Sequence, residues 1–136
     1  MKFLVDVNVI SEATKPEPHA GVVAWLRAHE AEVVLDAVVL GEVRLGILLL
    51  PKGARRRALE QWFAARVESL VCLPWDAATA LRWAELLAHL RHRGEAMPLK
   101  DSMIAATALA HGLTVATRNV RDFKKAGAKV VDPFRS

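Results

Sequence analysis

Five short segments dominated by apolar residues alternate along the chain with longer stretches in which apolar residues recur at helical spacing. Short apolar segments indicate strands, and near-continuous ones favour burial on both faces of a parallel sheet. An acid, Asp6, interrupts the first of them. The predicted strands are residues 3–7, 32–35, 70–73, 113–116 and 129–131.

Seven helices are predicted between and after these strands. Asp76 is a predicted N-cap, Pro51 follows one helix, and Gly94 and Gly112 follow the ends of two more. The predicted helices are residues 8–13, 19–30, 38–50, 53–69, 76–93, 101–111 and 120–126. The helix at 38–50 is so apolar that we expect it to be largely buried.

This alternation of strands and helices predicts an α/β sandwich with a mostly parallel five-stranded sheet. No repeat or linker divides the chain, so we expect one domain over residues 1–136. Ligands of such sheets bind beyond the carboxyl ends of the strands, where the strand order reverses. Asp6, which ends the first strand, and Thr117, Arg118 and Asn119, which follow the fourth, belong to that edge.

Glu42 is the only acid in a helix of apolar residues. At helical spacing it shares a face with Val39, Leu45 and Leu49. A carboxylate on such a face is partly desolvated and resists ionisation unless a cation compensates it. A salt bridge to Arg44, or to a more distant arginine, explains Glu42 equally well from the sequence alone.

Asp101 follows the same pattern, because Ile104, Ala105 and Ala108 lie on its face of the helix at apolar positions. An aspartate in a first helical turn also acts as a cap or dipole partner, however, and Asp6 is equally suited to cap a short helix after the first strand. Taken singly, each acid has a structural explanation.

Considered together, Asp6, Glu42 and Asp101 indicate more than any one of them does alone. They come from three separate segments that the predicted topology can bring to one sheet edge. Like charges at short range raise one another's pKa, a conflict that a divalent cation removes. Oxygen ligands without cysteine or histidine favour Mg²⁺ or Mn²⁺ over zinc. The pattern indicates a metal site that can bind a phosphodiester and activate water.

Composition and charge change this picture only a little. The chain has 136 residues, 53% of them hydrophobic, and a formal net charge of +4, which is compatible with a polyanionic partner. Its one cysteine, Cys72, lies in an apolar segment and is expected to be a buried, inert thiol. No signal-peptide pattern or membrane-length apolar run is present, so a cytoplasmic protein without membrane contact is expected.

Four motifs carry a resemblance to a known family: LVDVNVISE, LGEVRLGI, PLKDSMIAATALAHGL and TVATRNVRDF. Over nearly its whole length the chain resembles the PIN-domain ribonucleases, specifically the VapC-type toxins of bacterial toxin–antitoxin pairs. The resemblance implies a three-layer α/β/α fold, a Mg²⁺-dependent endoribonuclease and a small antitoxin encoded beside it. It also implies a homodimer and a toxin–antitoxin hetero-oligomer.

Carried over residue by residue, the family's acidic site falls on Asp6, Glu42 and Asp101. Asn8 matches the polar residue that shapes the pocket beside the first aspartate. We expect in-line hydrolysis of an RNA phosphodiester, with Asp6 and Asp101 holding the metal and Glu42 holding it or orienting the attacking water.

Three positions depart from the family pattern. Val7 stands where threonine is frequent, Asp36 where serine is usual, and Asn119 at the fourth acidic position. Because an amide carries no charge for a second metal, we expect one metal, with Asn119 positioning water or acting as an outer ligand. Asp122, three residues on, is a second candidate for the fourth position or a cap of the short helix.

Basic residues near the predicted sheet edge are candidates for contact with the RNA backbone. Arg118 comes first, with Thr117 and Asn8 as further substrate-binding candidates, and residues 91–93 come second. The arginine run at 55–57 is more typical of a solvated helix face. The four tryptophans fall at core-like spacing, which favours packing over base stacking.

Two other functions fit parts of the pattern. A phosphatase or receiver-like domain also has an aspartate after its first strand. A receiver domain, however, needs adjacent acids there and a phosphorylatable aspartate after the third strand, where this chain has Pro74, Trp75 and Asp76. The other alternative is a catalytically silent RNA-binding or regulatory module that kept the PIN fold, and Val7 and Asn119 favour it.

Overall fold

The computed structural model describes residues 1–135 and contains a five-stranded sheet in which all neighbouring strands are parallel. Ser136, the last residue of the expected domain, lies outside the described residues. The strands are β1 (Phe3–Val5), β2 (Val33–Asp36), β3 (Cys72–Leu73), β4 (Thr114–Ala116) and β5 (Lys129–Val131), in the order β3-β2-β1-β4-β5. All five predicted strands are confirmed, with ends shifted by at most two residues.

The strand order reverses between β1 and β4. Leu4 of β1 lies opposite Val34 of β2 on one side and Val115 of β4 on the other. A reversal of this kind leaves a crevice at the carboxyl ends of the two strands. β1 ends at Val5, earlier than predicted, because Asp6 leaves the strand to cap the next helix.

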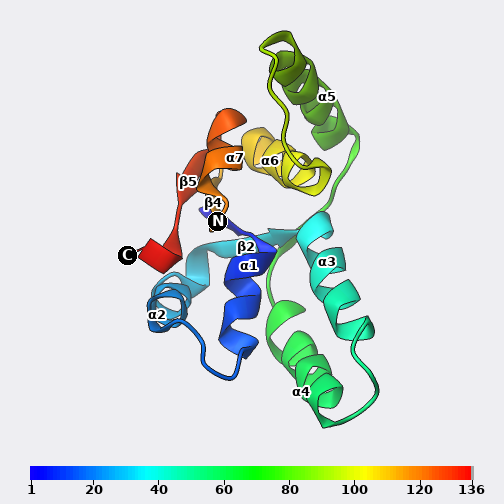
Figure 1. The fold of residues 1–136 in the computed structure, drawn as a ribbon, viewed down its shortest axis with the longest axis vertical. Coiled ribbons are helices and arrows are strands. Elements are labelled where there is room, and N and C mark those ends of the chain that lie inside the picture. Colours follow the sequence, from blue (N-terminus) through cyan, green and yellow to red (C-terminus); the bar gives the residue numbers. More distant parts are fainter. Residues whose placement is uncertain (136) are drawn as a thin grey trace.

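Helices cover both faces of this sheet. They are α1 (Val7–Ile10), α2 (Ala20–Ala28), α3 (Ala37–Leu48), α4 (Ala54–Trp62), α5 (Ala77–His92), α6 (Leu99–His111) and α7 (Val120–Lys125). Shorter helical turns are η1 (Ser11–Thr14), η2 (Glu30–Glu32), η3 (Phe63–Val67) and η4 (Pro133–Arg135). In Figure 1, α5, α6 and α7 lie above the sheet and α1 to α4 lie below it, which confirms the three-layer arrangement. Within residues 1–135, no helix is long and apolar enough to cross a membrane.

The capping residues sit where the sequence predicted them. Asp76 accepts a hydrogen bond from the backbone N–H of Thr79 at 3.1 Å and so begins α5. Gly94 and Gly112 follow α5 and α6 with φ angles of 67° and 64°, in the left-handed region that favours glycine. Gly94 thus marks the end of α5 and Gly112 the end of α6, the helix that carries Asp101.

Two predictions about burial are wrong. Only one stripe of α3 is buried, formed by Val39, Val43 and Ile47, while Leu49 just beyond it is 75% exposed. Residues four apart form a single stripe, and besides this stripe only Val38 and Leu40, near the start of α3, are partly buried against the core. Cys72 is exposed, because β3 is a two-residue strand at the sheet edge with β2 as its only strand neighbour.

The four tryptophans are packed, as predicted. Trp25 meets Phe3 edge to face, with ring centroids 5.0 Å apart, and Trp62 lies against the core. Trp75 and Trp83 each donate a hydrogen bond of 3.0 Å to a residue of α6. Trp83 therefore joins α5 to α6, and Trp75 joins the segment just before α5 to the same helix.

Candidate active site

Asp6 follows β1 directly, and both of its carboxylate oxygens accept hydrogen bonds. Oδ1 accepts from the backbone N–H of Val7 at 2.8 Å, which caps α1. Oδ2 accepts from the hydroxyl of Thr117 at 2.7 Å and from the amide of Asn8 at 3.3 Å. Burial raises the pKa of Asp6, and these hydrogen bonds lower it in part. Asp6 is a cap, as one reading predicted, but capping occupies only one of its oxygens.

Thr117 and Asn8 tie the loop after β4 to the start of α1. The Thr117 hydroxyl accepts from the backbone N–H of Asn119 at 2.9 Å, and Asn8 Oδ1 accepts from the backbone N–H of Arg118 at 3.1 Å. The sequence predicted that Thr117 binds substrate, but Thr117 is fully buried. Its place in the structure is that of a support for Asp6. Asn8 is half-buried beside Asp6, where it was expected.

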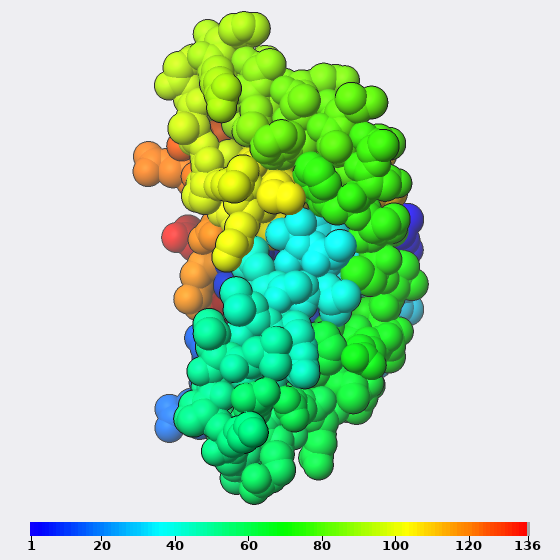
Figure 2. Space-filling model, turned by 90° about the vertical axis from the view of Figure 1, so that its right-hand side faces the viewer, coloured from blue at the N-terminus to red at the C-terminus, as the bar shows by residue number. Residues whose placement is uncertain are grey.

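A second buried aspartate, which sequence reasoning noted only as a departure, joins α3 to α6. Asp36 ends β2 and accepts from the backbone N–H of Val39 at 2.9 Å, which caps α3. It also accepts from the Thr107 hydroxyl of α6 at 2.7 Å, and Asp36 and Thr107 are both fully buried. Figure 2 shows the start of α6 (yellow) against the start of α3 (cyan). An acid between a strand and a helix indicates an N-cap, so the bond of Asp36 to Val39 had a signal in the sequence, whereas its bond to Thr107 had none.

Glu42 lies in the second turn of α3 and is half-buried. Within the described residues, its Oε1 is a buried atom with no hydrogen-bond partner. Burial raises the pKa of Glu42, the charge of Lys100 lowers it, and the charges of Asp6 and Asp36 raise it. The proposed salt bridge to Arg44 is absent, since Arg44 pairs with Glu60 at 3.8 Å instead. One explanation of Glu42 is thereby removed.

Asp101 lies in the first turn of α6, facing the other acids. Burial, followed by the charges of Asp6 and Asp122, raises its pKa to about 6, and the charge of Glu42 adds to this. The N-cap of α6 is Pro98, and no side chain caps that end of the helix. The capping explanation of Asp101 therefore has no hydrogen bond to support it.

Asn119 and Asp122 both lie beside Asp101. The Asn119 amide donates to Asp101 Oδ2 at 3.5 Å, and this contact lowers the pKa of Asp101. Asp122 raises that pKa through its charge and pairs with Lys125 at 3.8 Å. Asn119 is the N-cap residue of α7 without a capping side-chain bond, and Asp122 is in its first turn. The structure brings both candidates for the fourth position to the acidic group.

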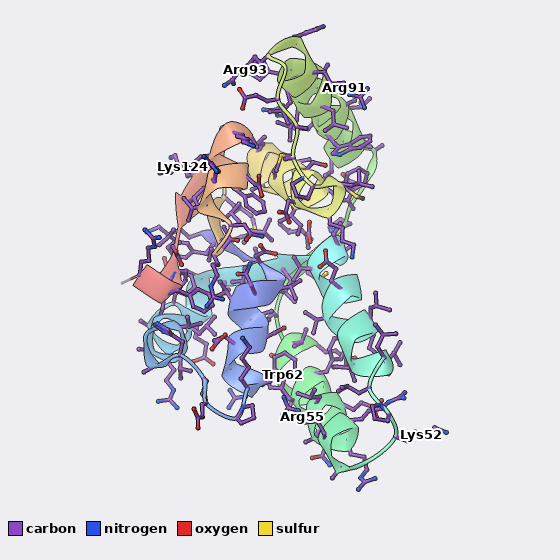
Figure 3. All side chains as sticks on the ribbon, viewed as in Figure 1. Lys52, Arg55, Trp62, Arg91, Arg93 and Lys124 are labelled. Atoms are coloured by element: carbon purple, nitrogen blue, oxygen red, sulfur yellow. The ribbon has the colours of Figure 1, made fainter. Side chains whose placement is uncertain are left out.

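The basic residues predicted to touch RNA are not all near the acids. The Arg118 guanidinium lies 3.7 Å from the ring centroid of Phe134, and the Arg118 backbone N–H donates to Asn8, beside Asp6. Figure 3 places Arg91 and Arg93 at the far tip of α5, away from the sheet edge. Arg55 lies at the other end of the molecule, where it donates to the carbonyl of Thr14 at 2.8 Å. Arg118 is joined to the Asp6 side through Asn8, and Lys100, which sequence reasoning did not single out, is a cation whose charge acts on Glu42.

The acidic group fits a divalent cation in its chemistry. The charge of Asp6 raises the pKa of both Glu42 and Asp101, the charge of Glu42 raises that of Asp101, and a buried oxygen of Glu42 lacks any donor. Oxygen-only donors of this kind suit hard cations. Within residues 1–135, no three histidine, cysteine, aspartate or glutamate side chains form a ready-made ligand set. Carboxylates that no cation neutralises repel one another, and this repulsion opposes their approach to the distances of a ligand set.

Comparison with known proteins places this chain in a family. The PIN domain model matches residues 3–129. VapC ribonuclease Y4jK of Sinorhizobium fredii is 36% identical over 97% of each chain. Toxin FitB of Neisseria gonorrhoeae is 37% identical over 97% of this chain and 98% of its own length. The crystal structure of FitAcB from Neisseria gonorrhoeae has a TM-score of 0.92 and 36% identity, covering 98% of this chain and 99% of that one. This chain belongs to the PIN-domain family.

Proposed function

We propose that this chain is a divalent-metal-dependent endoribonuclease and the toxin of a toxin–antitoxin pair. The observation that carries the proposal is the unsatisfied charge of the acidic group, in which Glu42 has a buried oxygen without a donor and Asp101 a pKa raised to about 6. Folded proteins retain such groups chiefly at functional sites. Relatives named as a ribonuclease and as a toxin support RNA as the substrate.

The proposed metal ligands are Asp6, Glu42 and Asp101, and the proposed ion is Mg²⁺, for which Mn²⁺ can substitute. When bound, such an ion neutralises a phosphate oxygen and lowers the pKa of a coordinated water. Asn119 contributes an amide in place of a fourth carboxylate, which favours a single ion. Asp122 is the alternative outer ligand, since its charge reaches Asp101.

The side chains have distinct proposed roles in hydrolysis. Asp6 is held in one orientation by Thr117 and Asn8, so it defines where the phosphodiester lies. Glu42, whose pKa is raised by burial, is suited to accept the proton of the attacking water. Arg118 contacts a phosphate of the RNA backbone.

The same proposal includes a partner and an assembly. A small antitoxin is expected to wrap the toxin and to place a basic side chain among the carboxylates, where it would compensate the same charge as the ion. A homodimer and a toxin–antitoxin hetero-oligomer follow from the family resemblance, with residues 1–136 acting as one nuclease domain in the cytoplasm. The reading frame beside this one is expected to encode the antitoxin.

Incubation of the purified chain with total RNA tests the activity. Cleavage at mapped sites is expected with Mg²⁺ or Mn²⁺, and none with EDTA or with Asp101→Ala. The alternative, a silent RNA-binding module, predicts RNA binding without cleavage at any metal concentration. Full cleavage by Asp101→Ala would overturn the assignment of the acids.

A further inference from the structure

A cavity of about 750 Å³ lies beside the acidic group, and most of its charged lining residues are basic. It lies between α7, β5 and η4. Six of its lining side chains are charged, and four of these are basic. The charged residues are Arg118, Arg121, Asp122, Lys124, Asp132 and Arg135.

The two acids in this lining are already paired. Asp132 forms an ion pair of 3.7 Å with Arg135, and its Oδ1 accepts from the backbone N–H of Phe134 at 3.0 Å. Asp122 pairs with Lys125 at 3.8 Å. The acids therefore have compensating cations of their own.

Three cations of the lining, Arg118, Arg121 and Lys124, form no ion pair with any residue of the described part of the chain. All three are exposed. Arg118 is nevertheless ordered, because its guanidinium stacks on Phe134 and its backbone N–H is held by Asn8. Like charges gathered without partners attract anions, and an arginine with a fixed plane is suited to phosphate.

Two residues of the cavity lining also interact with the acidic group. Asn119 and Asp122 line the cavity, and both also act on Asp101, one through its amide and the other through its charge. The basic lining and the acidic group are therefore neighbours through Asn119 and Asp122. The half-buried ring of Phe134 adds an apolar surface next to Arg118.

We propose that this cavity is the subsite that holds the RNA backbone adjacent to the cleaved phosphodiester, with Arg118, Arg121 and Lys124 contacting phosphates. The inference rests on the proposed ribonuclease function for the identity of the polyanion. Contacts of this kind position the strand without reading its sequence.

A second basic cavity provides a matched control. It has a volume of about 290 Å³ and is lined by Lys52, Arg56, Arg57 and Glu60. Figure 3 shows Lys52 and Lys124 far apart, on opposite sides of the sheet. The double variants Arg121→Ala/Lys124→Ala and Lys52→Ala/Arg57→Ala each remove two exposed cations, so they change the net charge equally.

Binding of a labelled single-stranded RNA is measured for both double variants in an Asp101→Asn background, across a range of KCl concentrations. We expect the Arg121→Ala/Lys124→Ala protein to bind several-fold more weakly at low salt. The slope of log K against log[salt] should fall by about 1.4, the value for two lost phosphate contacts on a single strand. The Lys52→Ala/Arg57→Ala protein should keep the parent affinity and slope. The variant Arg121→Lys should retain most of the binding.

If both double variants bound RNA equally weakly, the loss would be explained by net charge alone, and the proposed subsite would be wrong. Unchanged RNA affinity with weaker binding to the neighbouring antitoxin would also overturn it, in favour of a protein partner. Because the readout is binding, it is independent of cleavage. Binding that depends on this cavity, in a chain that cuts no RNA, would support the subsite and refute the proposed activity. In a chain with its acids intact, the subsite predicts a raised KM with little change in kcat.

Discussion

Around Asp6, both carboxylate oxygens have hydrogen-bond donors, whereas Glu42 has a buried oxygen without a donor and Asp101 has a pKa raised to about 6. The Asp6 side is formed by short loops at the point where β1 and β4 meet. The other side is formed by two helices, α3 and α6, that a buried hydrogen bond between Asp36 and Thr107 joins. Both sides carry negative charge, but only on the first does each carboxylate oxygen have a hydrogen-bond donor.

This difference separates a part that is preorganised from a part that a cation completes. The Asp6 side costs little to reorganise, because its donors are in place before any ligand binds. The Glu42 and Asp101 side is destabilising as long as its charge is unneutralised. We therefore expect substitutions on the two sides to affect activity and stability in different ways.

The largest effect is expected from Asp101→Asn. Loss of a proposed metal ligand should lower RNA cleavage by more than the roughly 10–100-fold that is typical of residues that only support a ligand. The metal-free protein should unfold at the same or a higher temperature, because one of several repelling charges is removed. Cleavage kinetics and thermal unfolding check the two halves of this prediction. A large drop in both would indicate a structural residue.

A smaller effect is expected from Thr117→Val. The substitution keeps the volume but removes the donor to Asp6 Oδ2, so metal affinity or activity should fall by about 10–100-fold. Stability should fall by about 1–3 kcal/mol, because a buried carboxylate loses a hydrogen bond.

Thr79→Val is the matched control, since Thr79 is also fully buried and its hydroxyl donates to Asp76 at 3.0 Å. It should destabilise the fold less, because the exposed carboxylate of Asp76 can bond to water instead, and it should leave cleavage per folded molecule unchanged. Equal losses of activity in the two variants would remove the distinction between the Asp6 support and ordinary capping.

Thr107→Val should act mainly on stability. Asp36 keeps its bond to Val39 but loses the donor on α6, at a cost of about 1–3 kcal/mol measured by denaturant unfolding. Activity should fall only a few-fold, through the altered placement of α3 against α6. If activity fell as far as in Asp101→Asn, Asp36 would have to be counted with the metal ligands.

The smallest effect is a pH dependence of the metal-free protein. The pKa of Asp101 is about 6 in the folded state and 3.8 ordinarily, so the folded state holds this proton more tightly. The resulting stability is fully present below pH 3.8 and is lost as the pH rises through 6. Without metal, the contribution of Asp101 lowers the unfolding temperature between pH 5 and pH 7. If the unfolding temperature of Asp101→Asn fell by the same amount between pH 5 and pH 7, the pH dependence would belong to other groups.

The strand and helix order was predictable because local signals were strong. Apolar segments marked the strands, and Asp76, Gly94 and Gly112 marked helix ends where the structure has them. Burial was harder to predict, because a run of leucines on α3 does not reveal which stripe meets the core. Leu49 and Cys72 are exposed for reasons of tertiary position alone.

The acids of the site were predictable as a group, but their supports were not. Hydrogen bonds from Thr117 to Asp6 and from Thr107 to Asp36 join residues more than 70 positions apart. Nothing in the local sequence distinguishes these threonines from others. The basic cavity likewise forms between α7, β5 and η4, and only the folded structure shows that these elements lie together.

Metal binding tests the central claim most directly. Isothermal titration of the metal-free protein with Mn²⁺ at pH 7.5 should show one site in the wild type, and Asp101→Asn and Glu42→Gln should each weaken it strongly. Mn²⁺ should also raise the unfolding temperature of the wild type at this pH, where the carboxylates are ionised. Equal Mn²⁺ affinity in the wild type and both variants, or no binding by the wild type at millimolar Mn²⁺, would contradict the account.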